Sequence, residues 1–151
     1  FVDWVNEYDI SSPVTSIADL ADGAILFEIL HTVDSKRFKL NRGHEVGENW
    51  VMRFNNLKRL HRLLIRHFEE HSESSASERG GEPTNLDGLA KDTPNLTIIA
   101  KESDPAELVK LCQLVVYIAC QGETASDCVA KIQRLTQTSQ KAMMFAIERV
   151  L

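Results

Sequence analysis

The sequence has no apolar run long enough to cross a membrane, no signal peptide at its start and no excess of positive charge. A membrane-spanning helix needs about 18 uncharged apolar residues, and every apolar run in this chain is shorter. The net charge of −5 and the isoelectric point near 5.5 argue against a general nucleic-acid binder, which usually carries a basic face. Because the first residue is Phe1 rather than Met, we interpret the chain as a fragment that would lack any true N-terminal signal.

Cysteine is also scarce. The chain has 3 cysteines and no Cys-x-x-Cys pair, and an odd count does not suit a disulfide framework or a zinc ribbon. Each cysteine lies in an apolar helical context, so we expect buried, reduced thiols in a cytosolic protein. These residues are Cys112, Cys120 and Cys128.

Helical periodicity is present over nearly the whole length, without a hairpin signal or an internal repeat. The 151 residues are enough for one domain with its own core. We predict an all-α bundle spanning 1–151 around one buried helix at about 105–121, which Asp104 caps and Pro105 begins. Other helices are expected at about 1–8, 17–34 and 49–70, from 124, and from 138. The segment 71–84 is rich in Ser, Glu and Gly and is predicted to be a flexible loop insertion.

Motifs for catalysis are weak. The stretch from His67 to His71 matches the inverted zinc-protease pattern H-x-x-E-H, in which Glu70 would be the general base. We favour the interpretation that it is the polar end of a long helix, because a metal site needs a rigid surrounding shell and the predicted loop follows at once. No Gly-x-Ser-x-Gly motif, phosphate loop or Cys/His pair stands out. We therefore expect no enzyme activity, no cofactor and no metal.

The helix predicted at 49–70 has a basic side. Clustered cations of this kind attract tubulin tails, actin and anionic lipids, although a solvated helix face partly neutralised by local acids is the simpler interpretation. The cations are Arg53, Lys58, Arg59, Arg62 and Arg66.

The closing stretch SQKAMMFAIERVL, residues 139–151, has more apolar surface than one core contact needs. On a helical wheel Ala142, Ala146 and Val150 point one way, suitable for the core, and a second sector groups around Gln140. That sector contains Met143, Met144, Ile147 and Leu151. Methionines suit a groove that adapts to a partner helix, and an amide among them could fix the register of that helix. Periodicity alone leaves open whether the sector contacts a partner or the rest of the domain.

Four stretches resemble one known family. They are ISSPVTSIADLADGAILFEILHTVD, ENWVMRFNNLKRL, SDPAELVKLCQLVVYIACQ and SQKAMMFAIERVL. Together they resemble the N-terminal Hook domain, the calponin-homology-like module of the Hook family of cytoplasmic dynein adaptors, over nearly the whole chain apart from the insertion. The resemblance implies a calponin-homology-like helical bundle with an additional C-terminal helix. Upstream of Gln140, QRLTQTS lacks the acidic residues associated with animal members, which could alter the rim of a binding groove.

The resemblance also implies partners. An amphipathic helix of the dynein light intermediate chain would dock in a groove that includes the last helix. The family's binding Gln and Ile fall on Gln140 and Ile147, and Met143 and Met144 would be groove walls. The full-length protein would join the dynein–dynactin complex, dimerise only through a coiled coil beyond the C-terminus, and link cargo such as endosomes to microtubule transport. It would be cytoplasmic, associated with the cytoskeleton or endosomes, and would have no nucleic-acid partner. The alternative function is a calponin-homology domain that contacts microtubules or actin through the basic side at 49–70.

Overall fold

A computed structural model describes residues 1–10, 13–39, 49–79 and 93–150, apart from the side chains of 71–79, 146 and 148–150. Every regular element among these residues is helical, which confirms the predicted all-α fold. In chain order they are α1 (Val2–Val5), the 3-10 helix η1 (Ile17–Leu20), α2 (Ala24–Val33), α3 (Trp50–Arg79), α5 (Leu96–Glu102), α6 (Pro105–Ala119), the 3-10 turn η2 (Gly122–Thr124), α7 (Ala125–Gln133) and α8 (Gln137–Val150). No described helix is both long and apolar enough to span a bilayer.

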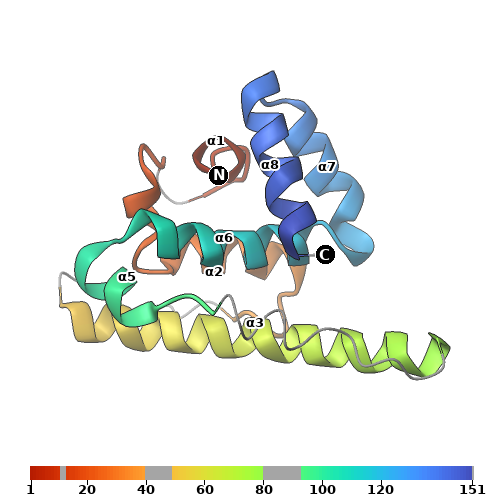
Figure 1. Cartoon of the computed structure of the whole chain (residues 1–151), viewed down its shortest axis with the longest axis horizontal. Helices are drawn as coiled ribbons and strands as arrows, with labels where there is room; N and C mark the ends of the chain where they lie inside the picture. Colours follow the sequence, from red (N-terminus) through yellow and green to blue (C-terminus); the bar gives the residue numbers. More distant parts are fainter. Residues whose placement is uncertain (11–12, 40–48, 80–92, 151) are drawn as a thin grey trace.

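Figure 1 shows how the helices are arranged. α6 crosses the middle of the domain, above the long α3, and it packs against α2, α3, α5 and α8. α7 and α8 lie side by side at one end, close to α1 and the N-terminus. The pair formed by α7 and α8 therefore projects from a bundle whose centre is α6.

α6 is the buried central helix that the sequence predicts, and its start explains why it forms. The Asp104 carboxylate accepts a hydrogen bond from the Glu107 N–H at 3.0 Å, which satisfies a donor that has no partner inside the helix. The Glu107 carboxylate in turn accepts from the Asn95 N–H at 2.8 Å, at the cap of α5. This bond, supported by nearby Lys110, lowers the pKa of Glu107. Asp104 thus begins α6, and Glu107 ties the start of α6 to the cap of α5.

The helix predicted at 17–34 is interrupted, and that expectation is wrong in detail. η1 and α2 are separate because Gly23 takes a left-handed backbone conformation with φ of 76°, which glycine adopts without steric cost. A Cβ at this position would lie 3.2 Å from Nδ2 of Asn56 and 3.3 Å from Cδ2 of Leu57. Gly23 therefore allows the start of α2 to approach α3 closely. Apolar residues continue across the break, so periodicity could not reveal it.

α3 is longer than predicted. It continues to Arg79, so residues 71–79 of the expected loop insertion are helical, whereas 80–84 lie outside the described residues. The stretch lacks apolar periodicity, but it also lacks any Gly or Pro before Gly80, and those residues are the ones that end helices. In Figure 1 the last turns of α3 extend beyond the rest of the bundle.

Candidate partner-binding site

α7 and α8 form the candidate site, and they are attached to the bundle by few apolar residues. α7 buries only Cys128 and Ile132. From the next turn Leu135 is partly buried against the core, and α8 contributes Met143, which is fully buried, and Ile147, which is partly buried. A pair of helices held by so few contacts can adjust more easily than the centre of the bundle.

Gln140 joins α8 to the end of α7. Its side-chain Nε2 donates to the carbonyl oxygens of Gln133 at 3.0 Å and Leu135 at 2.9 Å, two carbonyls at the C-terminus of α7 that lack helical partners. Because both acceptors are carbonyls, the amide nitrogen must face them. The amide oxygen is left as the group through which Gln140 can accept a hydrogen bond from a partner.

The rotation of α8 differs from the expected one. Met143 has only 1% of its surface exposed and belongs to the core, and Ile147 packs partly against it. Ala142, which was assigned to the core sector, is exposed. A helical wheel gives angles between residues but not which side faces inward, and the larger Met and Ile side chains gain more from burial than alanine. The other two residues of that sector, at 146 and 150, and Leu151 lie outside the described side chains.

An exposed part of α8 lies next to Gln140. Met144 is 54% exposed and Phe145 is 62% exposed. These two side chains line a shallow cleft together with Gln137, Gln140 and Lys141. Of the sector predicted to meet a partner, Met144 is thus at the surface, Gln140 and Ile147 are half-buried, and Met143 is inside. The sequence reasoning missed three lining residues, Gln137, Lys141 and Phe145.

Residues 1–149 match the HOOK domain family. The chain belongs to this family. It is similar to Protein Hook homolog 1 of Gallus gallus, with 28% identity over 98% of this chain and 20% of that protein. Protein Hook homolog 3 of Homo sapiens shows 26% identity over 98% of this chain and 20% of that protein. The chain therefore spans about a fifth of the length of these relatives.

A solved structure supports the same assignment. The conserved domain of mouse HOOK1 in solution matches with a TM-score of 0.75 and 26% identity, over 97% of this chain and 85% of that one. The likeness confirms the predicted calponin-homology-like bundle. The names of the matched family and relatives refer to Hook proteins and to no enzyme.

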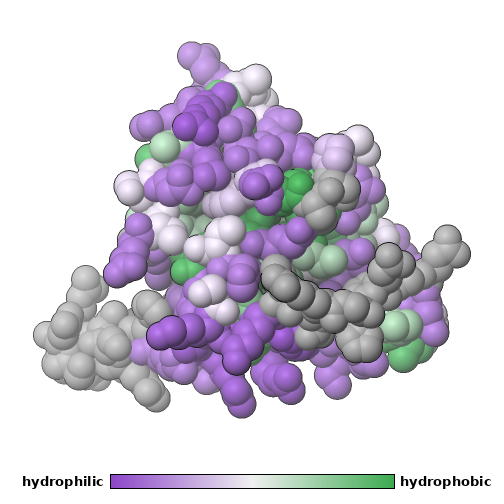
Figure 2. Space-filling model, turned by 180° about the vertical axis from the view of Figure 1, so that it is seen from behind, coloured by the Kyte–Doolittle hydropathy of each residue, from purple (hydrophilic) through white to green (hydrophobic). Residues whose placement is uncertain are grey.

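The basic side of α3 is divided between structural and exposed cations in this Hook domain. Arg53 donates from Nε to the Ala100 carbonyl at 2.9 Å, and Arg59 donates to the Lys39 carbonyl at 2.9 Å. Both therefore help to hold the bundle. The exposed cations recur every four residues along one line of the helix and are Lys58, Arg62 and Arg66. The middle of the lower edge of Figure 2, where α3 lies, is hydrophilic.

The residues of the H-x-x-E-H pattern have structural contacts. His67 is buried, with its ring 6.4 Å from that of Phe38, and Glu70 forms an ion pair with Arg37. The side chain of His71 is outside the described set. Within the part of the chain that the structure describes, no three potential metal ligands come together.

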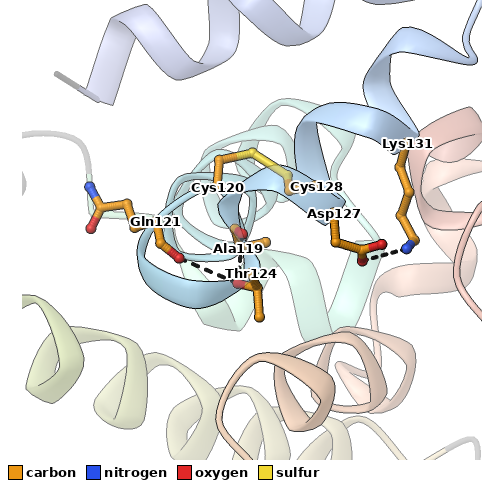
Figure 3. Close-up of a disulfide and its surroundings, with 7 residues drawn as sticks. All are labelled: Ala119, Cys120, Gln121, Thr124, Asp127, Cys128 and Lys131. Atoms are coloured by element: carbon orange, nitrogen blue, oxygen red, sulfur yellow. Dashed lines mark hydrogen bonds and ion pairs between the residues drawn. A yellow bond between two sulfur atoms is a disulfide. The ribbon is translucent and has the colours of Figure 1, made fainter.

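Two of the three cysteines are not the free thiols that the sequence predicts. Cys120 and Cys128 form a disulfide (Figure 3), and their Cα atoms are 5.3 Å apart, within the usual range for such a bridge. Cys112 is free and buried, and burial raises the pKa of its thiol to about 12. The expectation of reduced thiols is therefore wrong for Cys120 and Cys128, because sequence spacing does not show how the turn between α6 and α7 folds back.

Proposed function

We propose that this Hook domain is a dynein adaptor module that binds an amphipathic helix of the dynein light intermediate chain. In the full-length protein it would link cargo such as endosomes to microtubule transport by the dynein–dynactin complex, in the cytoplasm. Family membership and the implied binding positions Gln140 and Ile147 support this function. The observation that carries it is the cleft on α8, where exposed Met144 and Phe145 adjoin the amide of Gln140.

The geometry suggests how each residue would contribute. An amphipathic helix places an apolar face in a groove and a few polar contacts set its register. Met144 and Phe145 offer the exposed apolar surface, and Gln140 offers an amide oxygen beside it. Ile147 is half-buried, so its outer part can contact the partner while its inner part packs on the core. Met143 would support the wall from beneath.

Replacing Gln140 or Ile147 with alanine is expected to weaken binding of the light intermediate chain helix. Loss of a well-placed contact at the centre of an interface costs about 1–2 kcal/mol, which is roughly a 5- to 30-fold loss of affinity. Titration of a labelled peptide of that helix, followed by fluorescence anisotropy, measures the change. Lys58→Ala, at an exposed position of α3 away from α8, is the control and should bind like the wild type. If both α8 variants also bind like the wild type, the site is elsewhere.

The exposed line of Lys58, Arg62 and Arg66 favours a second candidate function, contact with microtubules or actin. Three cations on one helix line attract an acidic filament surface, and salt screens the attraction. The isolated chain should then pellet with microtubules or actin at low salt, and Arg62→Glu with Arg66→Glu should abolish pelleting. Gln140→Ala should have no effect in this assay. If the doubly substituted chain still pellets as well as the wild type, this second function is excluded.

A further inference from the structure

Apart from the main chain, the disulfide is the only covalent link, among the described residues, between α7 and the rest of the bundle. Cys120 is the C-cap of α6, and Cys128 lies in the middle of α7. Cys128 is also one of the two residues through which α7 enters the core, the other being Ile132. The disulfide, which Figure 3 shows, therefore fixes a helix in which only these two residues are buried.

The turn between α6 and α7 is closed without the disulfide. The Thr124 hydroxyl lies 2.9 Å from the Ala119 carbonyl oxygen and 3.3 Å from that of Gln121, and donates to this pair of acceptors. Figure 3 shows these contacts beside the sulfur atoms. Breaking the disulfide would leave the turn in place and remove the cross-link between α7 and the end of α6.

The remaining contacts of α7 with the N-terminal segment are weak. Arg134, just after α7, lies 3.7 Å from Glu7, and Lys131 lies 4.7 Å from the centre of the Tyr8 ring. The Arg134 side chain is largely exposed, and exposed ion pairs contribute little to stability. Motion of α7 would reach α8 through Gln140, which bonds to the carbonyls at the end of α7.

We infer that Cys120 and Cys128 are a reversible redox site that fixes α7 on α6 when oxidised and releases α7, together with the Gln140 contact, when reduced. The co-reactant is a small thiol of the glutathione class. Its thiolate attacks Sγ of Cys120, which is partly exposed whereas Cys128 is buried, and Cys128 leaves as a thiolate that takes a proton. A second small thiol attacks the mixed disulfide, frees the Cys120 thiol and forms the small disulfide. Two electrons thus pass from two small thiols to the protein, and the small disulfide reverses the reaction.

The third cysteine does not compete in this exchange. Cys112 is buried in α6, and burial raises the pKa of its thiol to about 12. Because the thiolate is the reactive form, Cys112 is nearly inert near neutral pH in the folded chain. Exchange is therefore directed to one pair.

Hydrogen exchange followed by mass spectrometry tests this inference on the whole chain. After reduction with dithiothreitol, backbone amides in α7 and the first turns of α8 are expected to exchange about tenfold faster, since local opening no longer strains a covalent link. Amides in α3 and α6 should keep their rates. Treatment with glutathione disulfide should restore both the Cys120–Cys128 linkage and the slow exchange.

Two variants provide controls. Cys120→Ser replaces a partly exposed residue, so it should fold, and it should show the fast exchange under oxidising and reducing conditions alike. Cys112→Ala should keep the redox response. Equal exchange in oxidised and reduced wild type, or faster exchange spread over α3 and α6, would overturn the inference, as would failure of glutathione disulfide to restore the linkage. No partner is needed in this measurement, so its outcome is separate from that of the proposed dynein function.

Discussion

Replacing Leu111 with alanine is expected to lower the free energy of unfolding by about 2–5 kcal/mol. Leu111 is fully buried in the middle of α6, where the surrounding helices cannot easily close the cavity that the substitution leaves. Domains of this size are stable by about 5–15 kcal/mol, so the loss is a large part of the total. Urea unfolding followed by far-UV circular dichroism measures it.

Val109→Ala is the matched control for this prediction. Val109 lies on the same helix but is only partly buried, and alanine is a better helix former than valine. Its unfolding free energy should therefore fall by less than about 1 kcal/mol. Equal losses in the two variants would show that α6 is not the centre of the core.

The sequence predicted α6 well because local and global signals agree there. Asp104 and Pro105 mark its start, and apolar residues on nearly every side require a buried position. The same kind of reasoning failed at Gly23, where the signal is a single backbone conformation inside a continuous apolar pattern. It also failed at 71–79, where a polar helix without an apolar stripe resembles a loop in composition.

The sequence identified the surplus apolar surface of α8 but not which side of the helix faces outward. Gln140 and Ile147 lie on one side of α8, as their seven-residue spacing requires. That side faces the core, however, and the side with Met144 faces outward. Orientation depends on which residues α6 and α7 present to α8, and no pattern within α8 contains that information. The disulfide was missed for a similar reason, since the close approach of Cys120 and Cys128 depends on a tertiary turn.

Met143 and Met144 give the sharpest test of this orientation, because they are adjacent methionines with 1% and 54% exposure. Met143→Ala is expected to lower the unfolding free energy by about 2–5 kcal/mol, as for other buried methionines. Met144→Ala is expected to change it by less than about 0.5 kcal/mol, and to weaken binding of the light intermediate chain helix about tenfold or more. Urea unfolding and peptide titration on the same two proteins measure both quantities.

The two variants also distinguish two ways of binding. A partner helix that docks on the outward side of α8 contacts Met144 and leaves Met143 in the core, so the binding loss should belong to Met144→Ala. A partner that instead contacts the side shared by Gln140, Met143 and Ile147 must first displace α8 from the core. Met143→Ala would then make α8 easier to displace from the core but would also remove a contact with the partner. Met144→Ala would bind like the wild type. That pattern would contradict docking in the cleft beside Met144 and Phe145, and it would place the partner where α8 now packs on α6.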